Sequence, residues 1–281
     1  MLAYSVIVQV HAWQRRVVGK GLRSGLPRGA DVAHAALFIV AGSFTLCAQL
    51  DAQTLQFRQL TPDNGLQSSR IGAIQQDSRG FMWFGSRRGL SRYDGYVFTV
   101  YRHRNGDTTS LADNRIIALH EDHDRSLWIG TELGLTRYDP ARDAFTNFRL
   151  SPSETLAVNT IAEAQGMLLV GTTRGLYVFD RATGKASPYG GGLFASYPIW
   201  RVYEDRAKHV WVGTETAGAF DFDPVKGTAQ QWTHVAGKVT SLPGRDARGF
   251  HEDSAGGMWI SLYDAGLARL DRASGDRKSV V

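Results

Sequence analysis

The chain has 281 residues, a formal net charge of +5 and a single cysteine. Residues 1–50 carry +4 of this charge, which leaves +1 for the rest and excludes the strongly basic surface that nucleic-acid binding needs. The length is ample for a hydrophobic core, and one cysteine excludes a scaffold held by disulfides.

The N-terminal segment, residues 1–52, has the features of an export signal. Basic residues between positions 15 and 28 are followed by an uncharged run at 35–48. A run of this length is short for a membrane span and fits the apolar core of a signal peptide. Residues 1–52 are therefore predicted to be a signal peptide with a basic prelude, cleaved after Ala48 or Ala52, or else an N-terminal anchor. Both alternatives place the following residues in the periplasm or outside the cell.

A five-fold repeat fills residues 53–271. The phrase Trp-Ile-Gly-Thr, or a close variant, begins at positions 83, 128, 169, 211 and 259, so the intervals are 45, 41, 42 and 48 residues. This is the length of one four-stranded propeller blade. In the first copy, apolar runs predict strands at 71–77, 81–86 and 89–94 and an outer strand at 96–101. The predicted fold is all-β, a β-propeller of four-stranded antiparallel blades with five repeats.

Three kinds of residue recur from copy to copy, and each has an expected structural role. The tryptophans lie within apolar strands and are expected in the core: Trp83, Trp128, Trp211 and Trp259. The aspartates end the first strand and are expected to accept hydrogen bonds in the turn that follows: Asp77, Asp122, Asp205 and Asp253. The glycines are expected to supply the positive φ of hairpin turns: Gly85, Gly130, Gly171, Gly213, Gly89, Gly134, Gly175 and Gly218.

The repeat also resembles a known family. The second copy reads Ile-Ile-Ala-Leu-His-Glu-Asp at 116–122, Leu-Trp-Ile-Gly-Thr at 127–131 and Gly-Leu-Thr-Arg-Tyr-Asp at 134–139. This pattern resembles the two-component regulator propeller repeats in the periplasmic sensor regions of bacterial signalling proteins, and the resemblance covers about residues 55–271. It implies a full-length protein with two seven-bladed propellers, a small β-sandwich, a membrane helix and a histidine kinase or diguanylate cyclase. Because the 281 residues contain no counterpart of the kinase or cyclase, the chain itself is expected not to be an enzyme.

Two ways of closing the propeller are compatible with the sequence. The segment 55–60 resembles an outer strand and could complete the fifth blade, which would give a closed five-bladed ring. Alternatively, the chain is a truncated seven-bladed propeller. The second interpretation is favoured, because the family uses more blades and the polar tail 272–281 resembles no blade segment.

The sequence offers little catalytic chemistry. Its histidines are scattered through the blades without the spacing of a zinc site, and no phosphate loop, dinucleotide fingerprint or nucleophile elbow is present, so neither a cofactor nor a metal is expected. The alternative function is a propeller enzyme, a lyase or glycosidase, for which Glu132, Glu215 and Asp264 are the candidate carboxylates. A secreted propeller that acts only as a binding protein or scaffold is a further alternative.

Propeller topology predicts where a ligand binds. Connections from the fourth strand to the next blade, and turns from the second strand to the third, emerge together at one mouth of the central channel, and loops carry function more often than strands. The predicted ligand-binding residues there are Arg88, Arg174, Trp200, Tyr263 and Asp264.

The predicted function is an extracytoplasmic sensor of an unknown extracellular ligand. The family resemblance implies a carbohydrate-derived ligand, a homodimer in the full-length receptor, and membrane contact only through an N-terminal anchor or a downstream helix.

Overall fold

The computed structural model describes residues 59–238, 240–271 and 277–279, and these form five four-stranded antiparallel sheets. Two 3-10 helices accompany them, η1 (Pro62–Asn64) and η2 (Gly190–Gly192). The predicted export signal at 1–52 and almost all of the predicted strand at 55–60 lie outside the described residues. The all-β fold with four-stranded blades is confirmed.

Each blade is a run of four consecutive strands. Blade 1 contains β1 (Ile71–Gln76), β2 (Met82–Ser86), β3 (Gly89–Tyr93) and β4 (Phe98–Tyr101). Blade 2 contains β5 (Ile116–Glu121), β6 (Leu127–Thr131), β7 (Gly134–Asp139) and β8 (Ala144–Phe148). Blade 3 contains β9 (Val158–Ala164), β10 (Met167–Thr172), β11 (Gly175–Asp180) and β12 (Lys185–Pro188). Blade 4 contains β13 (Ile199–Glu204), β14 (Val210–Thr214), β15 (Ala219–Asp223) and β16 (Thr228–Trp232). Blade 5 contains β17 (Ala247–Glu252), β18 (Met258–Leu262), β19 (Gly266–Leu270) and β20 (Arg277–Ser279).

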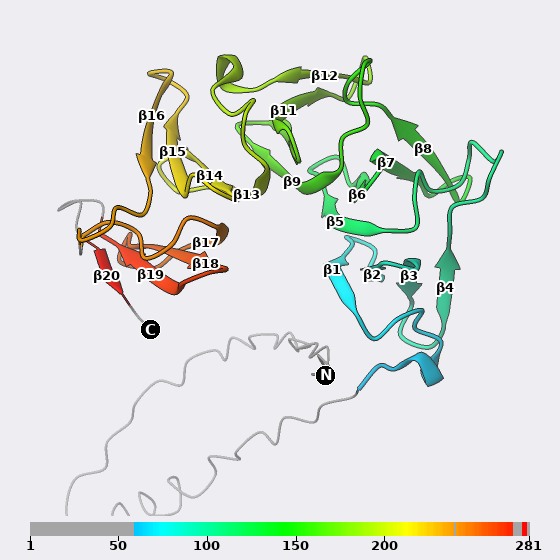
Figure 1. The fold of residues 1–281 in the computed structure, drawn as a ribbon. Coiled ribbons are helices and arrows are strands. Elements are labelled where there is room, and N and C mark those ends of the chain that lie inside the picture. The colour runs from blue at the N-terminus through cyan, green and yellow to red at the C-terminus, as the bar shows by residue number, and fades with distance from the viewer. Residues whose placement is uncertain (1–58, 239, 272–276, 280–281) are drawn as a thin grey trace, which may run out of the picture. The chain divides into compact units, whose positions relative to one another are not determined.

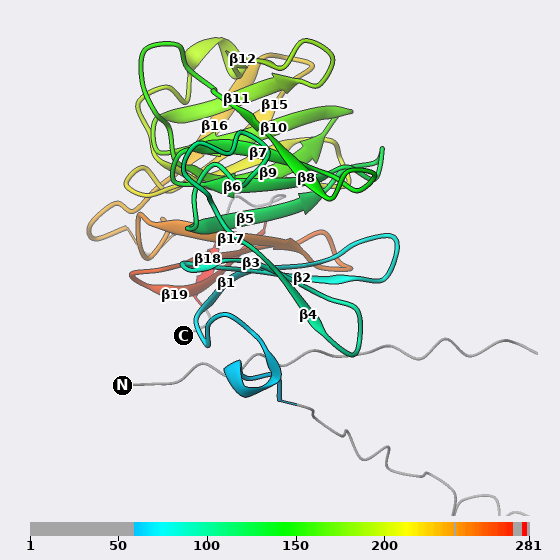
Figure 2. The same ribbon diagram turned by 90° about the vertical axis from the view of Figure 1, so that its right-hand side faces the viewer.

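The first strands of neighbouring blades lie beside one another. Contacts join β1 to β5, β5 to β9, β9 to β13 and β13 to β17, so these five strands surround the propeller axis. Figure 1 shows the blades following one another in an arc, with the fourth strands on the outside. The side view in Figure 2 shows their strands running in the same general direction, along the axis. This arrangement brings the starts of all five first strands to one end of the channel.

The polar ending of the chain was wrongly assigned to a tail. Residues Arg277–Ser279 form β20, which pairs antiparallel with β19 and completes blade 5 without the segment 55–60. A polar sequence is compatible with this position because outer strands face solvent. The equivalent strand β16 is also polar and mostly exposed. The fifth copy therefore does not stop after its third strand.

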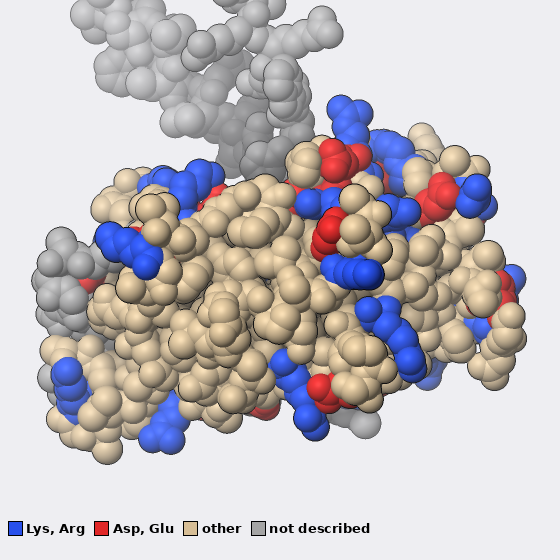
Figure 3. Space-filling view, turned by 90° about the horizontal axis from the view of Figure 1, so that it is seen from above, with Lys and Arg blue, Asp and Glu red and all other residues tan. Residues whose placement is uncertain are grey.

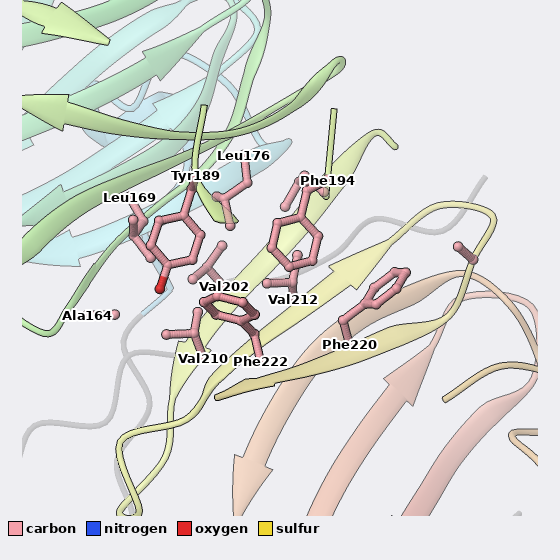
Figure 4. Close-up of a cluster of buried hydrophobic side chains, with 12 residues drawn as sticks. Ala164, Leu169, Leu176, Tyr189, Phe194, Val202, Val210, Val212, Phe220 and Phe222 are labelled. Carbon is pink, nitrogen blue, oxygen red and sulfur yellow. The ribbon is translucent and has the colours of Figure 1, made fainter. Parts of the chain in front are cut away.

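Apolar layers between blades hold the propeller together. In the layer shown in Figure 4, Leu169 and Leu176 of blade 3 lie against Val202, Val212 and Phe222 of blade 4. The connection between the two blades adds Tyr189 and Phe194, and Phe194 is fully buried. Burial of one such side chain contributes about 1.5–3 kcal/mol. These layers need apolar residues on both faces of a blade, which explains the apolar runs in the sequence.

The repeated aspartates and tryptophans form one hydrogen-bonded unit. The indole Nε1 of each tryptophan donates to the carboxylate six residues earlier, at 2.9 Å for Asp77, 2.7 Å for Asp122, 2.8 Å for Asp205 and 2.9 Å for Asp253. The second carboxylate oxygen accepts backbone amides of the turn, as from Ser126 to Asp122 at 2.9 Å. The predicted role of the aspartates in the turn is confirmed, whereas their hydrogen bonds to the tryptophans were not predicted. Trp83, Trp128 and Trp211 are fully buried, as predicted, whereas Trp259 is partly exposed.

The two sets of repeated glycines have different roles. Gly89 has φ +122°, and Gly134, Gly175 and Gly218 are also left-handed, as predicted for the turns. The prediction for Gly85, Gly130, Gly171 and Gly213 is wrong, because they lie in the second strands and have no positive φ. A Cβ at Gly85 would lie 2.6 Å from Ile116 Cγ2, and one at Gly213 would lie 2.5 Å from the Ala247 carbonyl oxygen. These glycines allow the next blade to approach closely.

A second repeated contact joins each blade to the next. A glutamate of the following blade's first strand accepts a backbone amide from the turn after the preceding blade's first strand. The four pairs are Ser78 N with Glu121 (2.7 Å), His123 N with Glu163 (2.8 Å), Gln165 N with Glu204 (2.5 Å) and Arg206 N with Glu252 (2.9 Å). These glutamates are called the interblade glutamates below. They lie at the ends of the first strands, away from the strand starts.

Candidate functional site

Every first strand begins with a β-bulge. The pairing register shifts by one residue between the first and second strand of each blade, which leaves one first-strand residue unpaired. The five bulge residues are Gly72, Ile117, Asn159, Trp200 and Arg248. A bulge turns its side chain away from the regular alternation of the strand and is common beside binding sites. All five bulge residues line one cavity of about 620 Å³.

This cavity is the predicted mouth of the channel. It receives residues from just before the first strands, such as Arg70 and Arg115, from the end of β2, Ser86, and from the turn that follows, Arg87. Because the five bulge residues come from five different blades, the whole described arc contributes to one hollow. A ligand there would contact every blade. We call it the mouth cavity.

The mouth cavity is strongly basic. Five arginines line it, Arg70, Arg87, Arg115, Arg201 and Arg248, and none of its described lining residues is acidic. Arg115 pairs with Glu132, and Arg248 donates from Nε and Nη2 to the Asp246 carboxylate at 2.5 and 2.6 Å. The other three guanidinium groups form no ion pair with a described residue, and all three residues are exposed.

Arg248 is held rigidly over an aromatic ring. Its Cζ lies 3.7 Å from the centroid of the Trp200 ring and 5.2 Å from that of Tyr263. Such a cation–π contact contributes about 0.5–2 kcal/mol, in addition to the two hydrogen bonds to Asp246. The indole Nε1 of Trp200 is buried and has no hydrogen-bond partner among the described residues. Arg248 and Trp200 thus form a fixed part of the cavity wall.

The predicted site residues fall into two groups. Trp200 lines the mouth cavity, Tyr263 lies beside it over Arg248, and Asp264 accepts the amides of Arg245 and Asp246 at 3.1 and 3.4 Å. Burial of the Asp264 carboxyl opposes ionisation, but these amide hydrogen bonds outweigh it and hold its pKa below the usual range. Asp264 therefore orients the segment that leads to the bulge.

The other predicted residues, Arg88 and Arg174, do not line the cavity. Arg174 pairs with Glu154 at 3.3 Å on the exposed surface, and the amide of Arg88 donates to Ser86 Oγ at 3.0 Å. The neighbour Arg87 lines the cavity instead, because consecutive residues of a tight turn point in different directions. The prediction missed Arg70, Arg115, Arg201 and Arg248. One signal was available, since Arg70 and Arg115 both directly precede an Ile that starts a first strand.

A second cavity, of about 480 Å³, lies at the ends of the first strands. Its wall includes His120, Glu163, Glu204 and also Arg201, which lines both cavities. Burial lowers the pKa of His120, and its Nε2 has no partner among the described residues. The described wall of this cavity thus carries two glutamates and one arginine, unlike the mouth cavity, whose described lining has no acidic residue.

Clusters of potential metal ligands or catalytic groups are already engaged. Asp205, His209 and Asp221 lie close enough to share an ion, but Asp205 accepts from Trp211 and from the His209 amide, while His209 Nδ1 lies 2.7 Å from Asp221. These contacts belong to the turn of blade 4.

The carboxylates proposed for an enzyme do not converge. Glu132 pairs with Arg115, Asp264 accepts backbone amides, and none of Glu132, Glu215 and Asp264 lines the mouth cavity. The described cavity therefore offers no pair of carboxylates for acid–base chemistry.

Comparison with known proteins agrees with the geometry. The sequence model of the family "Two component regulator propeller" matches residues 65–88 and 110–132, in blades 1 and 2. These two segments are thus similar to repeats of that family. Histidine kinase P4 of Formosa agariphila is 39% identical over 69 residues, which are 24% of this chain and 5% of the kinase. The chain thus matches only a small part of that relative's length.

Solved structures confirm the propeller fold. The chain matches the extracellular domain of BT3049 from B. thetaiotaomicron, assigned to a hybrid two component system, with a TM-score of 0.67 and 24% identity. The match covers 79% of this chain and 31% of that one. A catalytically inactive virginiamycin B lyase from Staphylococcus aureus, solved with quinupristin, matches with a TM-score of 0.61 and 10% identity over 81% of this chain and 74% of the lyase. At these identities the likeness shows the fold alone.

Within the part of the chain that the structure describes, no helix is long and apolar enough to cross a membrane.

Proposed function

We propose that the chain is the ligand-binding propeller of an extracytoplasmic sensor in a two-component signalling protein. The observation that carries this proposal is the mouth cavity, to which the bulge residues of all five blades contribute. A ligand that touches every blade can favour one arrangement of the blades over another. Such differential affinity is what a sensor needs to pass a signal on.

The comparisons support this proposal at the level of protein class. The matching family is named for two-component regulators, and two structural neighbours are described as extracellular domains of hybrid two component systems. The same class and the export signal predicted at 1–52 support an extracytoplasmic location, periplasmic or secreted, as part of this proposal. Dimerisation of the full-length receptor and an output by a downstream domain are further parts of this proposal.

The alternative of a propeller enzyme has less support. The lyase neighbours share the fold, but the described lining of the mouth cavity contains neither an acidic residue nor a histidine. Arginines can stabilise developing negative charge, yet a lyase or glycosidase also needs a group that transfers a proton. The cavity therefore favours binding over turnover.

Thermal unfolding of the purified chain with a library of soluble sugars, acids and peptides tests the proposal. A ligand at 100 times its Kd stabilises the folded state by about 2.7 kcal/mol, which raises the unfolding temperature by several degrees. The proposal expects at least one small molecule to produce this shift and to remain chemically unchanged. Absence of any shift supports the plain scaffold, and turnover of the ligand supports the enzyme.

A further inference from the structure

We propose that the mouth cavity binds a small ligand that carries two or more carboxylate or sulfate groups. This inference rests on the proposed binding function and specifies its ligand chemistry. Its basis is the meeting of five arginines in one hollow without a lining carboxylate. Guanidinium groups match the planar geometry of carboxylates and the oxygens of sulfate, with which they form charge-assisted hydrogen bonds.

The arginines do not follow from the repeat itself. Arg70 and Arg115 stand directly before the first paired residue of their strands, Arg248 stands one residue after it and Arg201 two residues after it. Arg87 belongs to a turn after the second strand. The blades that lack arginine at the first of these positions have Ala157, Pro198 and Asp246 there. Four different backbone positions thus supply the same charge to one place, which a structural role within the repeat does not require.

Three of the five charges are left for a ligand. Glu132 and Asp246 neutralise Arg115 and Arg248, whereas Arg70, Arg87 and Arg201 form no ion pair with a described residue. Like charges gathered in a hollow repel one another, and an anion of matching charge relieves this repulsion. Because these three groups come from blades 1 and 4, a ligand with several anionic groups fits them better than one with a single carboxylate.

The basic character is local to the cavity. The chain beyond residue 50 has a net charge of only +1, and on the face shown in Figure 3 basic and acidic side chains lie interspersed among uncharged residues. Long polyanions such as nucleic acids need an extended basic surface. A cavity of about 620 Å³ instead suits a molecule of the size of a disaccharide.

Calorimetric titration of the full chain with digalacturonate, citrate and a disulfated galactobiose tests the inference, with uncharged galactobiose as the matched control. Digalacturonate and galactobiose share the sugar framework and differ in their carboxylates. The inference expects at least tenfold tighter binding of digalacturonate or of the disulfated sugar than of galactobiose. Citrate separates charge alone from charge on a sugar, and the disulfated sugar separates sulfate from carboxylate. Equal binding of galactobiose, or no binding of any anionic probe, overturns the inference.

Arginine variants locate the site. Arg201→Gln removes a charge-assisted hydrogen bond and is expected to weaken binding of the preferred anion about tenfold or more. The triple variant R70Q/R87Q/R201Q is expected to abolish this binding. Arg174→Gln removes another exposed arginine, which lies outside the cavity, and is expected to change affinity less than twofold. Unfolding temperatures of all variants verify that they are folded. An equal effect of Arg174→Gln, or none of the triple variant, places the site elsewhere and overturns the inference.

The result also separates this inference from the proposed function. If a neutral ligand stabilises the chain and is unaffected by the triple variant, the chain is a binding protein but the anion site is wrong. If anions bind at the mouth cavity and do not change autophosphorylation of a full-length receptor, the anion site stands and the sensor function is wrong.

Discussion

The two ends of the channel use charged side chains for different purposes. At the strand ends, the interblade glutamates recur at all four junctions between described blades, and each accepts a backbone amide of its neighbour. At the strand starts, the arginines occupy different positions from blade to blade, and three of them have no ion-pair partner among the described residues. Charges that repeat and are paired hold the fold, whereas charges that do not repeat and are unpaired are available to a ligand.

The strand β13 contains both kinds of charge. Arg201 lies near its start and Glu204 is its last residue. Glu204 accepts the Gln165 amide of blade 3 at 2.5 Å, but Arg201 lines the cavities without a partner carboxylate among the described residues. The backbone of a blade is therefore common to all copies, and specificity lies in the side chains that the bulges present.

The largest loss of stability is expected from a residue of the repeat. Asp122→Ala leaves the buried Nε1–H of Trp128 without an acceptor and removes one of the two carboxylate partners of Arg181, which donates to Asp122 at 3.0 Å and also pairs with Glu163. The free energy of unfolding should fall by about 3 kcal/mol, measured by denaturant unfolding. The matched control Asp94→Ala, in an exposed turn, should cost clearly less. Equal losses for the two variants would contradict the structural role of the repeated aspartates.

A smaller loss is expected from an interblade glutamate. Glu252→Ala removes the acceptor of the Arg206 amide between blades 4 and 5, and should lower the free energy of unfolding by about 1–3 kcal/mol. Gln76 occupies the same strand position in blade 1, where, among the described residues, its side-chain amide donates only to the Gly80 carbonyl at 3.5 Å. Gln76→Ala should therefore be almost neutral in the same denaturant series. If Gln76→Ala lowered the free energy of unfolding as much as Glu252→Ala, the contact between blades would not be the cause of the Glu252→Ala loss.

The acid dependence of stability should distinguish the two ends further. Burial lowers the pKa of His120 below 6.5, so the unfolded chain binds the proton more readily than the folded one. Stability should be greatest above pH 6.5 and should decrease as the pH is lowered from 6.5 toward the folded-state pKa. Unfolding curves of wild type and His120→Gln between pH 5 and 8 measure this, and the variant should lose that part of the slope. An unchanged slope would mean that His120 titrates alike in both states.

The smallest effect on stability is expected at the mouth cavity. Arg201 is exposed, so Arg201→Gln should change the free energy of unfolding by no more than about 0.5 kcal/mol while it weakens anion binding. Denaturant unfolding beside the calorimetric titration gives both values for one sample. A stability loss as large as that of Glu252→Ala would make Arg201 a structural residue and remove the contrast between the two ends.

Much of the fold could be predicted from the sequence because repeated side chains report repeated contacts. The strand positions in blade 1 follow from the apolar runs that recur in each copy. The turn role of Asp77 and Asp122 follows from their repeated place at the end of a strand. The role of Gly85 was missed because both a close approach of the next blade and a tight turn require glycine, and the sequence alone does not distinguish the two causes. Strand β20 was missed because its sequence has no apolar pattern, and the mostly exposed fourth strand β16 shows that an outer strand does not need one.

The candidate site was less predictable, because it depends on the bulges. The bulge residues are Gly72, Ile117, Asn159, Trp200 and Arg248, which share no chemical property. Only the pairing register reveals that they face one cavity. Of these, Trp200 was predicted, because it stands outside the repeated phrase. Topology gave the correct end of the channel, but it could not tell Arg87 from Arg88 within one turn.

A crystal structure of the full chain with digalacturonate, or with whichever anionic probe binds most tightly, tests the central claim most directly. The account predicts ligand density in the mouth cavity, with anionic oxygens within hydrogen-bond distance of at least two of Arg70, Arg87 and Arg201. Density at another surface of the propeller, or anionic groups turned away from these arginines, would contradict it.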